Sequence, residues 1–337
     1  MFRVTIKEKN TKRCFFGGFM KKNILGNTKL EVTPVGFGVL TVGQTQLNLP
    51  IQEGASVLRY ALESGINFLD TAQYYQTYSY MKEALRGSNF DPIICSKSLS
   101  PSYTDMKDAI EEARREIDRD VIDIFLLHEV RNDPDFEIRS GAWEYLNEAK
   151  AKGLVKAIGV STHHVDVAEK MVDIPECDVL FPLINFRSMG IRRGFETGTK
   201  EDMASAIEEN ARKGKGVFTM KVFGGGNLTG HYLEALDYIS SLKGISSMMV
   251  GFGYNHEIDR IIEYVEGTID RHYTPDIKDK KIHIDEGDCE GCGACIRRCP
   301  NKALRYNANG LAEVDYSTCL TCGYCAPVCP VRAIILF

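Results

Sequence analysis

Short apolar runs alternate with amphipathic stretches along residues 22–275 of the chain. The apolar runs are rich in β-branched and aromatic residues and predict strands, and residues at helical spacing between them predict helices. Helix signals support this division, since Pro50 opens the stretch Ile51–Ser64 and Gly65 closes it. The predicted strands are Val35–Leu40, Asn67–Asp70, Ile93–Ser96, Ile122–Leu127, Ala157–Ser161, Val179–Ile184, Val217–Val222 and Met248–Gly251.

Eight strands that alternate with helices over about 250 residues predict an α/β fold of the (β/α)8 TIM-barrel type. A doubly wound open sheet is the alternative, but no G-x-G-x-x-G motif opens the first helix. Two further runs, Lys22–Leu25 and Leu30–Val32, flank Gly26 and Asn27 and predict a β-hairpin ahead of the barrel.

The chain ends are predicted to be separate from the barrel. Residues 1–21 form a basic N-terminal extension without the long apolar core of a secretory signal. Residues 276–337 contain most of the cysteines and predict a second, small α+β domain. No apolar run approaches the roughly 18 residues that cross a bilayer, so we expect no membrane span.

Eight of the eleven cysteines occur in two copies of the pattern C-x2-C-x2-C-x3-C-P, offset at every cysteine by the same spacing. This is the bacterial ferredoxin pattern, in which the fourth cysteine of each run binds the other cluster. Zinc sites and disulfides, the alternatives, have different spacings. The pattern therefore predicts a ferredoxin-like domain with two [4Fe–4S] clusters, the first held by Cys289, Cys292, Cys295 and Cys329 and the second by Cys319, Cys322, Cys325 and Cys299.

Composition narrows the function classes without choosing one. Apolar residues make up 44% of the chain and charged residues 26%, as in ordinary globular proteins. A formal charge of -5 gives no general attraction to nucleic acid. Iron–sulfur ligands together with the unpaired Cys14, Cys95 and Cys177 favour a reducing cytoplasm.

Polar residues stand at the ends of the predicted strands, where a TIM barrel builds its active site. Ionisable or hydrogen-bonding groups at several independent strand ends point to one shared site, and Tyr75 follows the second strand. The strand-end residues are Asp70, Lys97, His128, Ser161, Asn185 and Lys221. His163 and His164 begin the next helical stretch, and we expect them to be solvated there.

The segments Gly65–Ala72 with Tyr75, Ile94–Lys97, Leu126–His128 and Gly159–Ser161 resemble the aldo/keto reductase superfamily. The resemblance covers residues 22–267 and implies a catalytic tetrad of Asp70, Tyr75, Lys97 and His128. Tyr75 would give a proton to the substrate oxygen, with its phenol made more acidic by the Lys97 cation. Asp70 would hold Lys97 charged and oriented, and His128 would position the carbonyl oxygen.

The resemblance also implies a nicotinamide site that is less well matched. Its expected contacts are Ser161 and Thr162, where the family has a Ser-Asn pair; Asn185, near the position where Phe181 replaces a Gln; and Lys221, beside Met220, which replaces a stacking aromatic. After the eighth strand, Gly251, Gly253 and Asn255 lead to Glu257, where many relatives have cations for a 2′-phosphate. Because a carboxylate favours ribose hydroxyls over a phosphate, NADH is expected to bind at least as well as NADPH.

The sequence thus predicts a cytoplasmic oxidoreductase that acts on a small carbonyl or alcohol substrate. Its ferredoxin module would exchange electrons with a flavoprotein or another redox partner, with no role for nucleic acid or membrane. Three alternatives stay open: an electron-transfer subunit in which the barrel is a scaffold, a reductase that uses no nicotinamide and takes single electrons from the clusters, and an ordinary reductase beside which the ferredoxin module is a docking or structural domain.

Overall fold

The computed structural model describes residues 20–44, 46–276, 281–299, 301–319 and 323–336. Its larger part is a closed barrel of eight parallel strands in the order β11-β12-β3-β4-β5-β6-β7-β8, which confirms the predicted fold. The barrel strands are β3 (Val35–Gly38), β4 (Phe68–Asp70), β5 (Ile93–Ser98), β6 (Ile122–Leu127), β7 (Val155–Thr162), β8 (Val179–Pro182), β11 (Gly216–Thr219) and β12 (Ser247–Val250).

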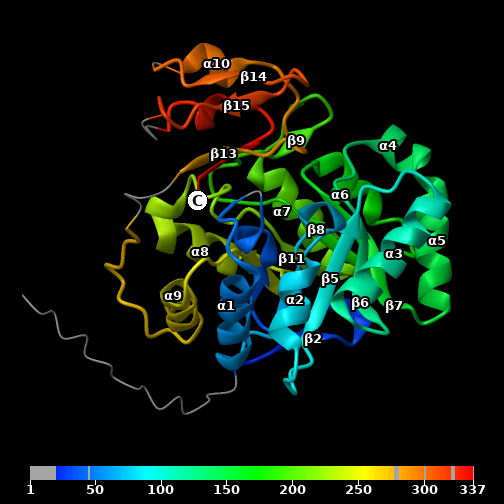
Figure 1. Ribbon diagram of the computed structural model, residues 1–337. Helices are drawn as coiled ribbons and strands as arrows, with labels where there is room; N and C mark the ends of the chain where they lie inside the picture. The colour runs from blue at the N-terminus through cyan, green and yellow to red at the C-terminus, as the bar shows by residue number, and fades with distance from the viewer. Residues whose placement is uncertain (1–19, 45, 277–280, 300, 320–322, 337) are drawn as a thin grey trace, which may run out of the picture.

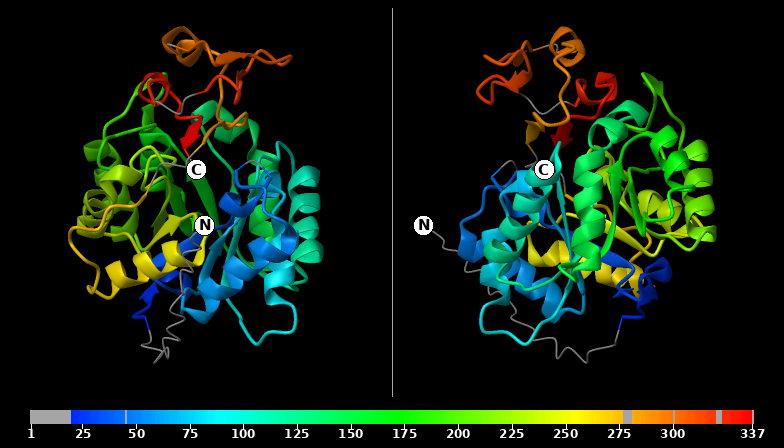
Figure 2. Two further views of the ribbon diagram at one scale, coloured as in Figure 1. Left: turned by 60° about the vertical axis from the view of Figure 1, so that its left-hand side comes forward. Right: turned by 90° about the vertical axis from the view of Figure 1, so that its right-hand side faces the viewer.

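Helices surround the barrel and cover the outer face of its strands (Figures 1 and 2). Their polar starts are capped as expected: the side chain of Ser102 accepts a hydrogen bond from Asp105 N–H at the start of α3, and Thr199 does the same for α7. The surrounding helices are α1 (Ile51–Glu63), α2 (Tyr78–Leu85), α3 (Tyr103–Ile117), α4 (Asp133–Ile138), α5 (Ser140–Ala151), α6 (Val165–Met171), α7 (Lys200–Arg212), α8 (Tyr232–Ser241) and α9 (Asn255–Val265).

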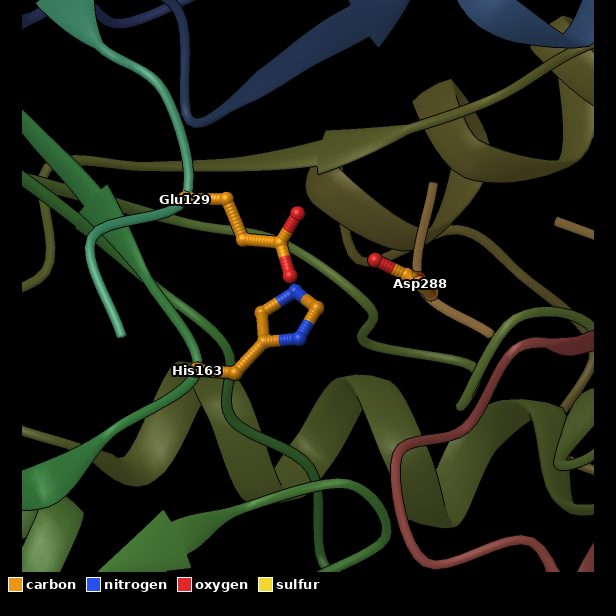
Figure 3. Close-up of side chains that lie close together, drawn as sticks. All are labelled: Glu129, His163 and Asp288. Atoms are coloured by element: carbon orange, nitrogen blue, oxygen red, sulfur yellow. The ribbon is translucent and has the colours of Figure 1, made fainter. Parts of the chain in front are cut away.

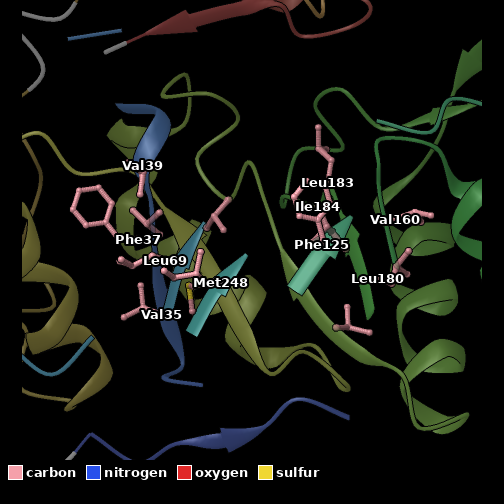
Figure 4. Packing of buried hydrophobic residues seen from close by; sticks show 14 of the residues in the cluster. Val35, Phe37, Val39, Leu69, Phe125, Val160, Leu180, Leu183, Ile184 and Met248 are labelled. Carbon is pink, nitrogen blue, oxygen red and sulfur yellow. The ribbon is translucent and has the colours of Figure 1, made fainter. Parts of the chain in front are cut away.

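Alternation along each strand divides the apolar side chains between two cores. In β6, Phe125 and Leu127 join the core between strands and helices, whereas Ile124 and Leu126 join the core inside the barrel. Figure 4 shows part of this outer core, with Phe125 near Leu183 and Ile184, which follow β8. The strands are therefore apolar on both faces, as buried parallel strands are.

A hairpin of β1 (Asn23–Ile24) and β2 (Glu31–Val32) closes the N-terminal end of the barrel, as predicted. Its buried side chains Leu25, Leu30 and Val32 pack into the core inside the barrel. This closure leaves the opposite end, where the strands finish, as the open mouth.

The C-terminal domain sits over that mouth (Figures 1 and 2). Leu336 N–H donates to Gly225 O at 2.8 Å, and Asn227 Nδ2 donates to Ile334 O at 2.9 Å. Its elements form two antiparallel strand pairs, β13 with β16 and β14 with β15. They are β13 (Ile282–Ile284), α10 (Ala294–Arg298), β14 (Leu304–Tyr306), β15 (Ala312–Val314) and β16 (Ile334–Leu336).

Two expectations concern the chain ends and the membrane. Residues 1–19 of the predicted N-terminal extension lie outside the described residues. Within the described ranges, none of the helices combines the length and apolar character that crossing a bilayer demands.

Candidate functional site

The barrel strands place three of the four predicted catalytic residues in one layer at the mouth. Asp70, Lys97 and His128 each stand two positions after a side chain that packs inside the barrel, so they point the same way. Those preceding side chains are Phe68, Cys95 and Leu126. The fourth residue, Tyr75, comes from a short 3-10 turn, Gln73–Tyr75, after β4.

Lys97 is held as a buried ion pair at the centre of this layer. Its Nζ donates to Asp70 Oδ1 at 2.7 Å, to Asp70 Oδ2 at 2.9 Å and to Thr71 O at 2.6 Å. The Lys97 residue is only 1% exposed. Its three donated hydrogen bonds satisfy the ammonium group inside the protein.

Tyr75 and His128 complete the cluster of four. The ammonium of Lys97 lies 4.8 Å from the centre of the Tyr75 ring, and the rings of Tyr75 and His128 meet edge to face at 5.6 Å between centroids. The structure therefore brings the whole predicted tetrad together at the floor of the mouth.

The surroundings of the Tyr75 phenol oppose its ionisation, and the expected effect of the Lys97 cation on its acidity stays a prediction. Burial raises the pKa of Tyr75 well above its ordinary value, and the carboxylate of Asp70 raises it further. The positive charge of Lys97 is offset by Asp70, with which it forms the ion pair. Tyr75 is consequently a protonated donor, and a strong base such as a substrate alkoxide is required to take its proton.

His128 is neutral in the same layer. Burial lowers its pKa well below the ordinary value, and the nearby Lys97 cation lowers it further. In the described part of the chain, Nδ1 of His128 has no hydrogen-bond partner. A neutral imidazole with an unengaged ring nitrogen can hydrogen-bond a substrate oxygen.

A cavity of about 270 Å³ opens above these residues. The tetrad members Asp70, Tyr75 and His128 line its floor, and other barrel loops line its walls. The C-terminal domain contributes residues as well, namely Asp285, Gly287, Asp288, Ile335 and Leu336. Because two domains build this cavity, the C-terminal domain is part of the site rather than a distant appendage.

The two hydroxyls expected to hold a nicotinamide are already hydrogen-bonded to backbone. Ser161 Oγ accepts from Glu129 N–H at 2.8 Å, and Thr162 Oγ1 donates to Val130 O at 2.6 Å. Both residues line the cavity. The Ser161 hydroxyl hydrogen is still available to a ligand, since this hydroxyl is used as an acceptor.

Asn185 is buried, and its side chain hydrogen-bonds to the backbone of the loop that follows it. Its Oδ1 accepts from Arg187 N–H at 3.2 Å and from Met189 N–H at 2.9 Å, and its Nδ2 donates to Met189 O at 2.9 Å. The cavity at this position is bordered instead by Phe181, whose ring stacks on Phe218 at 4.2 Å. The geometry thus gives Asn185 a structural task and places an aromatic ring beside the expected nicotinamide position.

Glu257 caps the helix that follows the eighth barrel strand. Its Oε2 accepts from Gly253 N–H at 2.7 Å and from Tyr254 N–H at 3.2 Å. Gly253 and Glu257 line the cavity, whereas Asn255 is exposed at the start of α9. The carboxylate therefore occupies the N–H groups that a phosphate would otherwise use.

Gly251 also lines the cavity, and the chain packs so closely around it that a side chain would not fit. A Cβ on Gly251 would lie 1.8 Å from Thr41 Oγ1, and one on Gly253 would lie 2.2 Å from a methyl carbon of Leu47. Both glycines let the loop after β3 pack closely against this part of the mouth.

Lys221 points at the C-terminal domain. Its Nζ pairs with Asp288 Oδ2 at 3.2 Å, and the carboxylates of Asp288 and Asp285 outweigh burial so that the pKa of Lys221 is raised. Nearby, Arg131 Nη2 donates to Gly287 O at 3.0 Å. Sequence reasoning missed these contacts, because no local pattern joins the loops after β6 and β11 to residues 285–288.

His163 is buried, contrary to the expectation of a solvated side chain at this position. It is 8% exposed and lines the cavity, so the expectation of a solvated residue is wrong, and burial lowers its pKa to about 4. It lies beside Glu129, a residue in the left-handed region with φ of 52°. Burial, together with the charge of Asp288, raises the pKa of Glu129 to about 8. The mostly apolar run of β7 (Val155–Thr162), which ends directly before His163, was the available sequence signal for a buried His163.

The cysteines of the C-terminal domain gather as the ferredoxin pattern predicts for the first cluster. One pocket is lined by Cys289, Cys292, Cys295 and Cys329, with apolar residues such as Ile284 and Val331 around them. Four converging thiols in an apolar pocket fit the four corners of a [4Fe–4S] cluster. This convergence includes the distant Cys329, which the local run alone does not bring near.

The structure describes three of the four cysteines of the second set, Cys299, Cys319 and Cys325. Burial raises the pKa of the Cys325 thiol to about 12, and Cys319 and Cys299 lie near enough to raise it further. Cys322 lies outside the described residues. The described cysteines are all free of disulfides.

Comparisons with known proteins agree with the two-part architecture. The profile of the aldo/keto reductase family matches residues 34–271, and that of a 4Fe-4S dicluster domain matches residues 282–336. The first match spans more than half of the chain, so the chain belongs to the aldo/keto reductase family, a family of oxidoreductases. A C-terminal dicluster domain is joined to it. The boundaries drawn at residues 21, 275 and 276 stay predictions.

Individual relatives are distant. The oxidoreductase YqkF of Bacillus subtilis, whose function is uncharacterised, is 27% identical over 168 residues, which cover 45% of this chain and 52% of YqkF. The 2,5-diketo-D-gluconic acid reductase B of a Corynebacterium is 30% identical over 131 residues, or 37% of this chain and 47% of that protein. The chain thus spans about half the length of the curated relatives it matches.

Among solved structures, the holo form of aldo-keto reductase AKR11C1 from Bacillus halodurans is similar, with a TM-score of 0.61 and 22% identity. The match covers 74% of this chain and 92% of that one. At this identity the likeness shows the barrel fold alone.

Proposed function

We propose that the chain interconverts a small carbonyl compound and its alcohol in the cavity at the barrel mouth. The observation that carries this proposal is the cluster of Asp70, Lys97, Tyr75 and His128 at the cavity floor. A buried acid, cation, phenol and neutral imidazole are the groups needed to orient a carbonyl and protonate its oxygen.

The roles proposed for the four residues rest on their geometry. His128 donates a hydrogen bond to the carbonyl oxygen and holds it near Tyr75. As negative charge develops on that oxygen, the Tyr75 hydroxyl gives up its proton, and the buried Lys97 ammonium stabilises the phenolate that remains. Asp70 keeps Lys97 in place throughout, through two hydrogen bonds from Nζ.

A nicotinamide dinucleotide, when bound, supplies the hydride for this reaction. The residues that line the cavity extend from Tyr75 to Gly253 and Glu257 at the start of α9, and the cofactor would lie along them. Ser161 and Thr162 would face the carboxamide and Gly251 the diphosphate, whereas the N–H of Gly253 is taken by Glu257. Because the Glu257 carboxylate already caps the helix start, the site favours NAD(H) over NADP(H).

The iron–sulfur domain is proposed to pass single electrons between the barrel and a redox partner, such as a flavoprotein. Residues 289–329 would hold two [4Fe–4S] clusters through the two cysteine sets. The cysteine content and these clusters favour the cytoplasm as the compartment.

A second candidate, a reductase without nicotinamide, is favoured by one specific observation. Asp288, which lines the cavity, directly precedes Cys289, a ligand of the first cluster. In this version the clusters, when bound and reduced by a partner, would supply two electrons one at a time. Tyr75 would give one of the two protons that the alcohol needs, and the other would come from solvent.

Anaerobic purification followed by iron and sulfide analysis tests the cluster part of the proposal. Two complete cysteine sets lead us to expect about eight irons and eight sulfides per chain. Cys292→Ala should deplete mainly the first cluster and Cys319→Ala mainly the second. Stoichiometric zinc in the cysteine sites, with no absorbance near 400 nm, would overturn it.

Optical titration with NADH and NADPH then separates the two candidates. Binding of NADH, followed by carbonyl-dependent oxidation, supports the hydride reaction. Failure of both nucleotides to bind, together with substrate reduction by pre-reduced clusters, supports the second candidate. No turnover of any carbonyl or alcohol by either route would contradict both.

A further inference from the structure

Three residues from three separate segments bring two carboxylates and one imidazole together where the C-terminal domain meets the barrel. Glu129 follows β6, His163 follows β7, and Asp288 precedes the first cluster cysteine. One ligand atom from each lies within 4.8 Å of the others. Figure 3 shows the Glu129 carboxylate beside the His163 ring, with the Asp288 carboxylate directed at the same space from the other domain.

The imidazole of His163 is the first sign that this space holds a ligand. The residue is more than nine-tenths buried, at 8% exposed. Among the described residues, no hydrogen bond engages its side chain. A buried polar ring without a partner is costly, and it faces the two carboxylates rather than an apolar wall.

The two carboxylates are each held by a cation on one oxygen only. Arg131 donates to Glu129 Oε1 through Nε at 3.1 Å, and Lys221 donates to Asp288 Oδ2 at 3.2 Å. Within the described chain, Glu129 Oε2 and Asp288 Oδ1 accept no hydrogen bond. Carboxylates that bind metal ions are typically oriented in this way, by a hydrogen bond to the oxygen that does not bind the metal.

The charge of the surroundings leaves room for a cation. Three carboxylates, of Glu129, Asp285 and Asp288, face two cations, Arg131 and Lys221. With all three carboxylates ionised, the formal balance is one negative charge in surplus. Because burial and Asp288 raise the pKa of Glu129 to about 8, a cation that binds there displaces the Glu129 proton. A buried surplus of negative charge favours binding of a positive ion.

We propose that Glu129, His163 and Asp288 bind one divalent transition-metal ion, separate from the iron of the clusters. One imidazole and two carboxylates suit Zn²⁺ or Fe²⁺ and leave at least one coordination position open. Such an ion joins the barrel to the iron–sulfur domain. It also borders the cavity that holds Tyr75 and His128, since all three ligands line that cavity. The site does not depend on the reaction proposed above.

Zinc binding by the full-length protein, purified anaerobically with intact clusters, tests the proposal. Equilibrium dialysis against Zn²⁺, read by elemental analysis, should give one zinc per chain with cluster iron and sulfide unchanged. His163→Gln and Glu129→Gln each remove one ligand and should weaken zinc binding by at least about 10- to 100-fold. The matched control is His164→Gln, the neighbouring imidazole outside the cluster, which should bind zinc like the wild type.

The iron and sulfide contents show whether zinc has entered the cysteine sites, because zinc bound there would displace cluster iron. Glu129→Gln is a second control, since Glu129 belongs to the barrel and not to the cysteine-containing domain. Absence of bound zinc in cluster-replete wild-type protein would overturn the proposal. Equal zinc binding by wild type, His163→Gln and Glu129→Gln would overturn it too, because the zinc would then lie elsewhere.

Discussion

The buried ion pair of Lys97 and Asp70 is the residue-scale feature on which the candidate site depends. Lys97 is 1% exposed, and its ammonium is satisfied by Asp70 and Thr71 O. Tyr75 packs its ring 4.8 Å from that ammonium. The pair thus fixes a positive charge beneath the phenol, although burial keeps the phenol itself protonated.

Breaking the pair from one side should destabilise the protein more than removing both charges. Asp70→Asn leaves the Lys97 ammonium buried without a counterion, which should cost about 3–5 kcal/mol of unfolding free energy. The double variant Asp70→Asn with Lys97→Met should recover much of that loss while staying inactive. Urea unfolding followed by the fluorescence of Trp143, the chain's one tryptophan, measures both. A double variant no more stable than Asp70→Asn would contradict this account.

Tyr75 should matter for rate far more than for binding. Tyr75→Phe keeps the ring and removes the transferable proton, so kcat should fall by roughly 10²–10⁴ with a modest change in KM. Tyr74→Phe is the matched control, because Tyr74 is 42% exposed and its ring lies beside Gly287. Full activity of Tyr75→Phe in a steady-state assay would show that another group protonates the substrate.

At the scale of elements, loops after the strands decide what each strand end can bind. The carboxylate of Glu257 caps the start of α9, and the hydroxyls of Ser161 and Thr162 at the end of β7 hydrogen-bond to the backbone of the loop after β6. These hydrogen bonds hold the loops at the mouth in place. They also engage hydroxyl and N–H groups at positions where aldo/keto reductases with the usual motif bind a dinucleotide.

Nucleotide preference should follow the cap on α9. Glu257→Arg exchanges repulsion for attraction at a 2′-phosphate and should shift preference toward NADPH by about 1 kcal/mol or more. Glu257→Gln is the control, because it keeps an oxygen that can accept from Gly253 N–H while removing the charge. Isothermal titration of each variant with both nucleotides measures the shift. Tight NADPH binding by the wild type, with negligible NADH binding, would contradict the prediction.

At the level of the whole molecule, the C-terminal domain covers the candidate site and forms the roof of its cavity, through Asp285, Gly287, Asp288, Ile335 and Leu336. Its strand β16 contacts the loop after β11, where Gly226 is in the left-handed region at φ of 84°. The two domains also contact each other through the ion pair of Asp288 with Lys221 and through the hydrogen bond that Arg131 donates to Gly287 O. Residues of both domains therefore line the cavity.

Disturbing this roof should impair catalysis without removing the clusters. A Cβ on Gly226 would lie 1.7 Å from Leu336 O, so Gly226→Ala must displace β16. We expect kcat/KM to fall by about 10- to 100-fold, as for misplacements of about 1 Å elsewhere, with cluster iron retained. Gly230→Ala is the control, since nothing lies within 4 Å of its added Cβ. Unchanged kinetics of Gly226→Ala would show that the roof is dispensable.

The sequence by itself determined the features that local patterns encode. Alternating apolar runs specify barrel strands because strand side chains alternate between two faces, and this alternation carries Asp70, Lys97 and His128 to one layer. Cysteine spacing likewise specifies a cluster-binding loop, since three ligands of a small cube must come from one short segment. These features needed no knowledge of distant contacts.

Only the tertiary structure decided how those groups are engaged. The pairing of Lys221 with Asp288 and the burial of His163 depend on segments that the chain separates widely and folding brings together. The high pKa of Tyr75 arises because burial removes water from the phenol while carboxylates of both domains surround it. Desolvation and charge add up over three-dimensional neighbours, and a linear pattern of residues does not contain them.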